Sequence, residues 1–183
     1  MTEFEYLSVL TSIIFGLGLT HILTGSIRAI YARKAGEIQL VYTAFVLLIL
    51  VLNWWVAFSW RDHPNWSFDA FLLMVCWSIA NFALAITLYP PSTSGSSEFD
   101  SHRHWFLWAF FVMGLLDIAQ TAMSGDLFHP WYYLPFVGHY IVLALVAIRF
   151  KQPWFQRAIA WWLLISILIW ALLVRRFLAM DLA

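Results

Sequence analysis

The chain has 183 residues, of which 63% are hydrophobic and only 11% are charged, and its formal net charge is zero. A soluble domain carries about 25% charged residues, so this composition excludes a water-soluble fold. The balanced charge and the absence of a basic run give no support to a nucleic-acid partner. The single cysteine, Cys76, excludes an intrachain disulfide.

Apolar runs long enough to cross a bilayer as helices recur six times along the chain. They predict one all-α integral membrane domain over residues 1–183, a bundle of six transmembrane helices. The first run lacks the basic segment and cleavage site of a signal peptide, so we expect it to be a retained helix. The predicted spans are residues 5–29, 38–60, 69–89, 104–125, 131–149 and 155–176.

The longest connection, residues 90–101, begins with two prolines and is rich in serine, which is typical of a flexible linker. The connections after the first, third and fifth spans carry seven of the ten basic residues. By the positive-inside rule this linker is cytoplasmic and both termini lie outside. In a bacterium the protein would lie in the inner membrane. The three basic residues on the opposite side are Arg61, Arg175 and Arg176.

Tryptophan is unusually frequent, with twelve residues in the chain. Most of them lie near the predicted ends of spans, where amphipathic indole rings serve as anchors at the membrane interface. We therefore expect most tryptophans to be anchors. The expected anchors are Trp60, Trp66 and Trp131 on the outer side and Trp105, Trp108 and Trp154 on the inner side.

Asp117 is the one carboxylate placed deep inside an apolar run. An ionisable group at that depth costs at least about 2.5 kcal/mol and is a functional candidate by default. Helical spacing places Asp117, Gln120 or Thr121, and Ser124 on one stripe of the fourth span. At 1.5 Å per residue, the polar residues of other spans fall near its depth. Asn53, His139 and Ser166 lie at the same depth in the outer half, and His21 and Asn81 lie deeper.

The matching depths predict a central polar site and, most specifically, a contact between Asp117 and His139 that would share a proton. Trp54 and Trp55 flank Asn53 and are expected to form an aromatic wall beside this site. The alternative is that Asp117 only links helices through neighbouring polar side chains. Those neighbours are Asn53, Gln120 and Ser166.

The two intramembrane histidines allow a second interpretation, in which His21 and His139 bind a b-type haem from its two faces. Otherwise His21 is a packing residue hydrogen-bonded to Asn81. His102 and His104, with Glu98 and Asp100 upstream, resemble a metal site, but a closed zinc site needs four ligands and two imidazoles at this spacing favour a solvated segment. No metal site is predicted, and no catalytic motif supports an enzyme.

Two further patterns concern helix packing. Ser8, Ser12, Gly16 and Thr20 form a small-xxx-small run that predicts a close helix contact. Pro135 either distorts the fifth span near His139 or sits in its first turn. The sequence leaves both possibilities for Pro135 open.

The sequence thus predicts a multi-pass inner-membrane protein that binds or transports a small solute, an ion or a proton, with no cofactor. The alternatives are a haem-b electron-transfer protein and a structural or assembly subunit of a membrane complex. The expected partners are the lipid bilayer and either a second copy of the chain or another membrane protein. The predicted site consists of Asp117, His139, Asn53, Gln120, His21, Asn81, Trp54 and Trp55.

Overall fold

The computed structural model describes residues 2–62, 66–90 and 99–173. Within these ranges the chain is helical and contains no strand. The helices are α1 (Glu3–Tyr31), α2 (Glu37–Ala57), the short 3-10 helix η1 (Phe58–Asp62), α3 (Phe68–Leu88), α4 (Phe99–Ser124), α5 (Tyr133–Arg149) and α6 (Pro153–Leu173).

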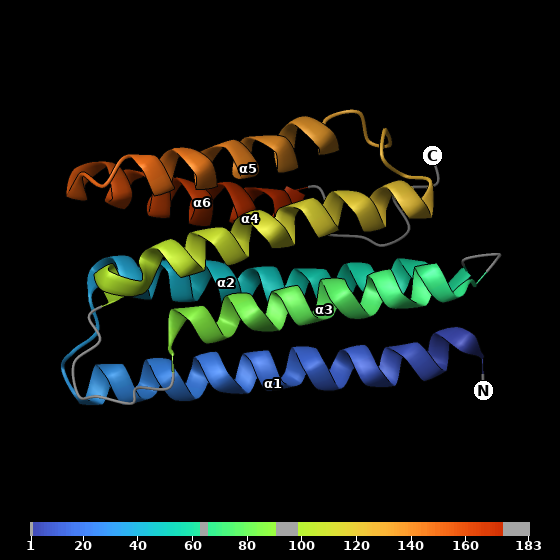
Figure 1. Ribbon diagram of the computed structural model, residues 1–183, viewed down its shortest axis with the longest axis horizontal. Helices are drawn as coiled ribbons and strands as arrows, with labels where there is room; N and C mark the ends of the chain where they lie inside the picture. Colours follow the sequence, from blue (N-terminus) through green and yellow to red (C-terminus); the bar gives the residue numbers. More distant parts are fainter. Residues whose placement is uncertain (1, 63–65, 91–98, 174–183) are drawn as a thin grey trace.

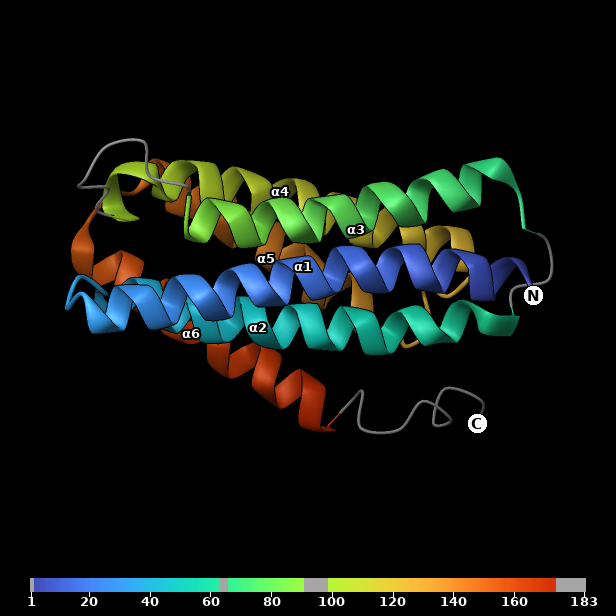
Figure 2. The same ribbon diagram turned by 90° about the horizontal axis from the view of Figure 1, so that it is seen from below.

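The described α-helices form a closed ring in the order α1, α3, α4, α5, α6, α2. In Figure 1, α3 and α4 lie in front of α2 and α6, while α1 and α5 close the two sides of the ring. Figure 2 shows the same arrangement from below, with α1 in front of α5. Successive helices run in opposite directions. We call the end at which α1, α3 and α5 begin the amino-terminal end, and the end at which α4 begins the linker end.

Of the helices in the described ranges, α1, α2, α3, α4 and α6 are long and apolar enough to cross a membrane. The remaining helix, α5, is equally apolar in character but has 17 residues, about 26 Å at 1.5 Å per residue. It begins at Tyr133 rather than at residue 131, because the chain between α4 and α5 forms turns. The all-helical fold with several spanning helices is compatible with a multi-pass membrane protein.

Large apolar side chains cover the outside of the ring as well as its interior. A helix that is apolar on all sides is suited to hydrocarbon rather than to water. Cys76, near the middle of α3, is also exposed on this outer surface. Side chains from several helices show the pattern, including Leu17, Val51, Ile79, Leu115 and Ile169.

The helix ends follow local sequence signals. Thr2 and Glu5 form a capping box at the start of α1, in which each side chain bonds the other's backbone N–H. α4 ends before Gly125, whose φ of 90° lies in the left-handed region that glycine adopts without strain. Pro135 is the third residue of α5, where its missing N–H has no intrahelical partner in any case. The structure therefore favours the first-turn interpretation of Pro135.

Part of the predicted linker is helical. Residues 91–98 lie outside the described residues, but α4 begins at Phe99, inside the range assigned to the linker. Phe99 is buried, with its ring 5.9 Å from both Tyr42 and Phe106. Burial of this apolar side chain against α2 draws the start of α4 into the bundle.

Among the described glycines of α1, the closest approach to another helix is not at Gly16 of the predicted small-residue run. A Cβ at Gly16 would have no neighbour within 4 Å, whereas one at Gly25 would lie 2.5 Å from the Tyr89 ring. Gly18 faces Ala85 of α3 at 3.6 Å. The prediction for Gly16 was wrong because a small side chain permits a close approach without specifying which face of the helix makes it. The face of Gly18 and Gly25 carries the contact.

Candidate functional site

A cavity of about 70 Å³ lies inside the ring, between α2, α4, α5 and α6. It occupies the half of the bundle nearer the amino-terminal end, where α2 and α4 finish and α5 starts. Its polar side is formed by Asn53, Asp117, Gln120, Thr121 and Tyr133. The rest of the wall is apolar or aromatic. Those residues include Ile49, Leu52, Phe110, Phe136, Val137, Tyr140, Ile167 and Trp170.

Asp117 contributes the carboxylate to this cavity and is held by neutral donors on both oxygens. The indole Nε1 of Trp77 donates to Oδ1 over 3.2 Å, and the Tyr133 hydroxyl donates to Oδ2 over 2.9 Å. Trp77 is fully buried and comes from α3, while Tyr133 is the first residue of α5. The carboxylate thus joins three helices and lies at the cavity wall.

The hydrogen bonds beyond Tyr133 point toward Asp117. The Gln120 amide donates to the Thr121 hydroxyl over 2.9 Å, and the Thr121 and Tyr133 hydroxyls are 2.8 Å apart. Because the Tyr133 proton is directed at Asp117, the Thr121 hydroxyl supplies the proton between them. Aligned donors of this kind polarise one another and stabilise a negative charge on the terminal acceptor.

Trp60 sets the orientation of the Gln120 amide, the first group in this series of hydrogen bonds. Its indole Nε1 donates to Gln120 Oε1 over 2.9 Å, and an indole nitrogen can only donate. The Gln120 amide therefore presents its nitrogen to Thr121. Both Trp60 and Gln120 are buried, so the geometry is protected from solvent. Trp60 was expected to be an interface anchor; that prediction was wrong, because its N–H is used inside the protein.

Asn53 and Asn81 meet on the other side of Asp117. The Asn53 amide donates to Asn81 Oδ1 over 2.8 Å, and the Asn81 amide donates to the Trp77 carbonyl over 2.9 Å. Asn81 is fully buried, so it can be stable there only with its amide hydrogen-bonded. This pair connects α2 to the helix that positions Trp77. The hydrogen-bonded groups therefore form a series that begins at Asn53, passes through Asp117 and ends at Trp60.

The structure does not pair Asp117 with His139. His139 lies between aromatic rings, 5.3 Å from Phe136 and 6.5 Å from Trp162 between centroids. Its buried Nε2 has no hydrogen-bond partner in the described part of the chain. The predicted contact was wrong because equal depth does not fix rotation about the helix axis. Val137 faces the cavity, and a residue two positions on points about 200° away.

His21 has a partner other than Asn81. Its Nε2 donates to the Tyr89 carbonyl over 2.8 Å, which satisfies one of the free carbonyls at the end of α3. His21 lies on α1 and His139 on α5, on opposite sides of the ring (Figures 1 and 2). Ser166 likewise bonds Tyr140 rather than Asp117. The structure therefore separates from Asp117 both His139 and Ser166, which the sequence placed at its depth, and it pairs His21 with a partner other than the predicted Asn81.

Trp54 and Trp55 do not line the cavity. Both are exposed on the outer surface of α2, and Trp54 donates to Ser12 of α1. The aromatic wall comes instead from other helices: Phe136 and Trp170 stack with centroids 3.9 Å apart and an angle of 10°. Asn53 lines the cavity, and Trp54 and Trp55 lie about 100° and 200° further around the axis of α2, on the side that faces away from it.

Sequence reasoning missed Trp77 and Tyr133, the two donors to Asp117. One signal was available: Trp77 and Asn81 are four residues apart and therefore share a face of α3. A buried carboxylate needs donors, and tryptophan and tyrosine are the donors that an apolar helix most easily accommodates. Because the tryptophans were expected to be interface anchors, the role of Trp77 as a hydrogen-bond donor to Asp117 was not predicted.

The predicted absence of a metal site can be compared only with the described residues. In those ranges no group of three or more histidine, cysteine, aspartate or glutamate side chains could hold a metal ion. His102 bonds Ser101, and the His104 ring lies 5.2 Å from the Trp105 ring between centroids, at a tilt of 40°. Glu98 and the Asp100 side chain lie outside the described residues.

The arrangement provides one carboxylate on the polar side of a cavity whose other walls are aliphatic and aromatic. It can accept hydrogen bonds from a ligand on the polar side and make apolar contacts with the ligand elsewhere. No protein-family model matches the chain, and no curated protein or solved structure matches it significantly.

Proposed function

We propose that this chain is a multi-pass protein of a bacterial inner membrane. In this proposal it binds a small cationic solute in the cavity and transports it. The observation that carries the proposal is the Asp117 carboxylate at the wall of an otherwise apolar and aromatic cavity. A carboxylate inside a membrane bundle is a functional candidate with a specific attraction for positive charge. The sequence predicts transport of a small solute, an ion or a proton, and the cavity favours a small cation among these.

The chemistry of the wall favours a protonated amine. Asp117 accepts hydrogen bonds, and a charge-assisted bond from an ammonium group is about twice as strong as a neutral one. Phe136 and Trp170 line the cavity and offer aromatic contact to the solute. Ile49 and Val137 offer apolar contact to a short alkyl tail.

The volume of the cavity indicates the size of a solute that fits within it. A water molecule needs about 10–15 Å³ of this kind of volume, so 70 Å³ holds about five waters or a solute of about five heavy atoms. An n-butylammonium ion has that size.

The arrangement supports the solute site better than the haem alternative. A b-type haem would need His21 and His139 at its two faces, but these residues lie on helices at opposite sides of the ring. His21 is also occupied at the end of α3. Neither imidazole lines the cavity.

A structural or assembly subunit is the second candidate. It is favoured by the half-exposed small-residue face of α1, where Gly16 has open space around it. Such a face admits a second helix at close range. The two candidates differ in which residue they make essential: Asp117 for the transporter and Gly16 for the assembly subunit.

Binding of n-butylammonium to the purified full chain in nanodiscs tests the proposal. We expect Asp117→Asn to weaken binding by about tenfold or more, because a charge-assisted hydrogen bond is lost. Butan-1-ol, which has the same size without the charge, should bind wild type correspondingly less well. Proteoliposome uptake of the amine should fall in parallel.

The matched control is Asp69→Asn, which removes an exposed carboxylate in the first turn of α3. It should leave amine binding unchanged. Equal affinities of wild type for the amine and the alcohol, or normal binding by Asp117→Asn, would contradict the proposal. If Gly16→Leu abolished co-purification of another membrane protein while Asp117→Asn had no effect on binding or uptake, the assembly function would replace it.

A further inference from the structure

Asn53 has a hydrogen-bond acceptor that the described part of the chain does not use. Its amide nitrogen donates to Asn81 Oδ1 over 2.8 Å, whereas no described group donates to the Asn53 oxygen. Asn53 is half-buried and lines the cavity together with Asp117. A polar group at the wall of a mainly apolar cavity is stabilised by a ligand that completes its hydrogen bonds.

The orientation of the Asn53 amide follows from that of Asn81. The Trp77 carbonyl can only accept, so the group that faces it over 2.9 Å is the Asn81 amide nitrogen. Asn81 then turns its Oδ1 to Asn53, which must present its own nitrogen. Asn81 is fully buried, so this arrangement is protected from exchange with solvent. The oxygen is therefore the end of the Asn53 amide left for a ligand.

Asn53 and Asp117 line the cavity from two helices and are connected through a third. Asn53 belongs to α2 and Asp117 to α4. On α3, Asn81 accepts the hydrogen bond from Asn53, and the Trp77 indole donates to Asp117 over 3.2 Å. The polar side of the cavity thus combines a carboxylate with a neutral amide oxygen.

Two acceptors suit a cation that donates several hydrogen bonds. A primary ammonium group carries three N–H donors, so it can bond Asp117 with one and Asn53 with another. A quaternary ammonium ion has the same charge but donates none, and proteins bind such ions with aromatic faces. Phe136 and Trp170 cover one face of each other, with centroids 3.9 Å apart. The polar side of the cavity therefore favours a primary amine.

We propose that Asn53 makes the cavity selective for primary ammonium ions over N-methylated ones. This inference rests on the cation site proposed at Asp117 and narrows its substrate class. Asp117 supplies the charge, the Asn53 oxygen accepts a second N–H of the same ammonium group, and Asn81 positions the Asn53 amide. Each N-methyl group removes one donor and adds volume beside the polar side of the cavity.

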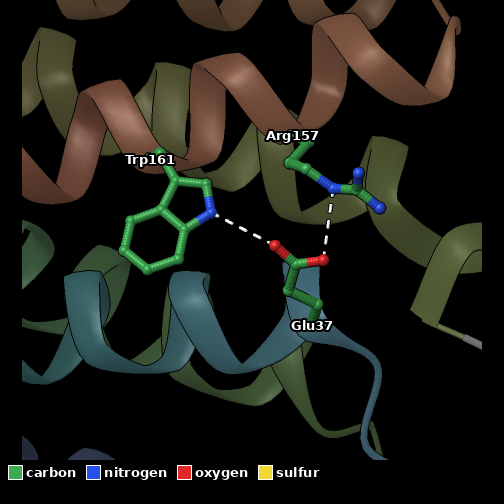
Figure 3. A network of polar contacts seen from close by, with 3 residues as sticks. All are labelled: Glu37, Arg157 and Trp161. Atoms are coloured by element: carbon green, nitrogen blue, oxygen red, sulfur yellow. Dashed lines mark hydrogen bonds and ion pairs between the residues drawn. The ribbon is translucent and has the colours of Figure 1, made fainter.

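A polar contact at the other end of α2 provides a control on the same helix. Glu37, in the first turn of α2, forms an ion pair with Arg157 at 3.2 Å and accepts a hydrogen bond from Trp161 over 3.3 Å (Figure 3). Both partners belong to α6. Because Glu37 is exposed and does not line the cavity, its substitution changes a polar contact of α2 without touching the solute site.

Binding of isomeric cations to the full chain in nanodiscs tests the selectivity. n-Butylammonium and tetramethylammonium have the same formula and charge, but only n-butylammonium carries N–H donors. We expect wild type to bind n-butylammonium about tenfold more tightly, because charge-assisted hydrogen bonds are open to that isomer alone. The tertiary isomer N,N-dimethylethylammonium, with one N–H, should bind with an intermediate affinity. Equal affinities of wild type for the isomers would overturn the inference.

Asn53→Leu removes the second acceptor and keeps a side chain of similar size. We expect its affinity for n-butylammonium to fall by about tenfold and its affinity for tetramethylammonium to stay within about twofold. Asn53→Leu combined with Asn81→Leu leaves neither amide of the pair without its partner and gives the same test if the single variant is unstable. Glu37→Gln should leave both affinities unchanged. An equal loss for the two cations in the Asn53 variants would overturn the role of Asn53.

Butan-1-ol separates this inference from the proposed function. We expect Asn53→Leu to keep a preference for n-butylammonium over butan-1-ol, because Asp117 is unchanged. If wild type binds both cations equally well and better than the alcohol, the carboxylate site stands and the selectivity for primary amines is wrong. If wild type binds neither cation better than the alcohol, the cation site itself is wrong, and the selectivity fails with it.

Discussion

At the scale of single residues, the donor-only groups around Asp117 fix the direction of its hydrogen bonds. Trp77 and Trp60 carry indole N–H groups, which cannot accept. Trp60 holds the Gln120 amide, and the chain through Thr121 then ends on the carboxylate. The charge of Asp117 is therefore accommodated by neutral groups from three neighbouring elements.

Removing the Trp60 donor tests this chain of contacts. In Trp60→Phe the side chain stays aromatic but becomes smaller, and Gln120 Oε1 loses its buried partner. We expect the free energy of unfolding in detergent to fall by about 1 kcal/mol, the usual value for a buried hydrogen bond in a membrane bundle. Denaturant unfolding followed by circular dichroism measures the loss.

Trp131→Phe provides the comparison, because Trp131 is 78% exposed in the turn before α5. Its stability should stay close to wild type. A Trp60→Phe protein as stable as Trp131→Phe would show that the orientation of the Gln120 amide does not depend on Trp60.

The sequence predicted the residue types of the polar side but not their partners. Asp117 was identified by its position in an apolar run, and Asn53 and Gln120 by depth and helical spacing. Partner choice depends on the rotation of each helix about its axis, which depth does not determine. That is why His139 was matched with Asp117 while Tyr133, at the start of the same helix, makes the contact.

At the scale of elements, side chains from α1 and α2 complete the end of α3. The last carbonyls of a helix lack intrahelical donors. Gln39 donates to the Leu88 carbonyl over 3.0 Å and His21 to the Tyr89 carbonyl over 2.8 Å. The Tyr89 hydroxyl pairs with Thr43 at 2.7 Å. These contacts hold the end of α3 against α1 and α2 at the linker end.

A methyl group at Gly25 should disturb this junction. In Gly25→Ala the new Cβ would lie 2.5 Å from Tyr89 Cγ and 2.7 Å from its Cβ, so the ring or the helix must move. We expect a loss of about 1–3 kcal/mol in unfolding free energy, typical of overpacking. Thermal unfolding in detergent is the measurement.

Gly16→Ala is the matched change on the same helix, since its Cβ would meet nothing within 4 Å. It should leave stability unchanged or raise it slightly, because alanine favours the helix over glycine. Equal destabilisation by the two substitutions would contradict the role assigned to the Gly25 face.

Element type was readily predicted, and element ends less so. Long apolar runs identify helices because hydrocarbon tolerates little else. The start of α4 depends on the burial of Phe99 against Tyr42, a tertiary contact, and so could not be read from the serine-rich composition before it. The start of α5 depends on the turns that follow Gly125.

At the scale of the whole molecule, the ring and the predicted orientation can be tested through the connections between helices. In a Cys76→Ser background, we expect a membrane-impermeant maleimide to label Ser59→Cys and Asp126→Cys from outside. Gly36→Cys and Gln152→Cys should react only after permeabilisation. All four positions are exposed in the structure, so reactivity reports the side of the membrane.

The pair Asp126 and Gln152 carries the most information, because these residues flank the 17-residue helix α5. Labelling of both from the same side would show that α5 does not cross the bilayer and would contradict the six-span prediction. Reversal of all four positions would keep six spans but place the termini in the cytoplasm.

Cys76 allows the depth of α3 in the membrane to be measured in the native chain. It is exposed on the outer surface of α3, near the middle of that helix, and it is the only thiol in the sequence. A nitroxide attached there would collide with molecular oxygen, which concentrates in hydrocarbon, and would be shielded from a water-soluble nickel chelate. The ratio of the two collision rates would measure the depth of the midpoint of α3 below the lipid phosphates. This measurement needs no substitution in the protein.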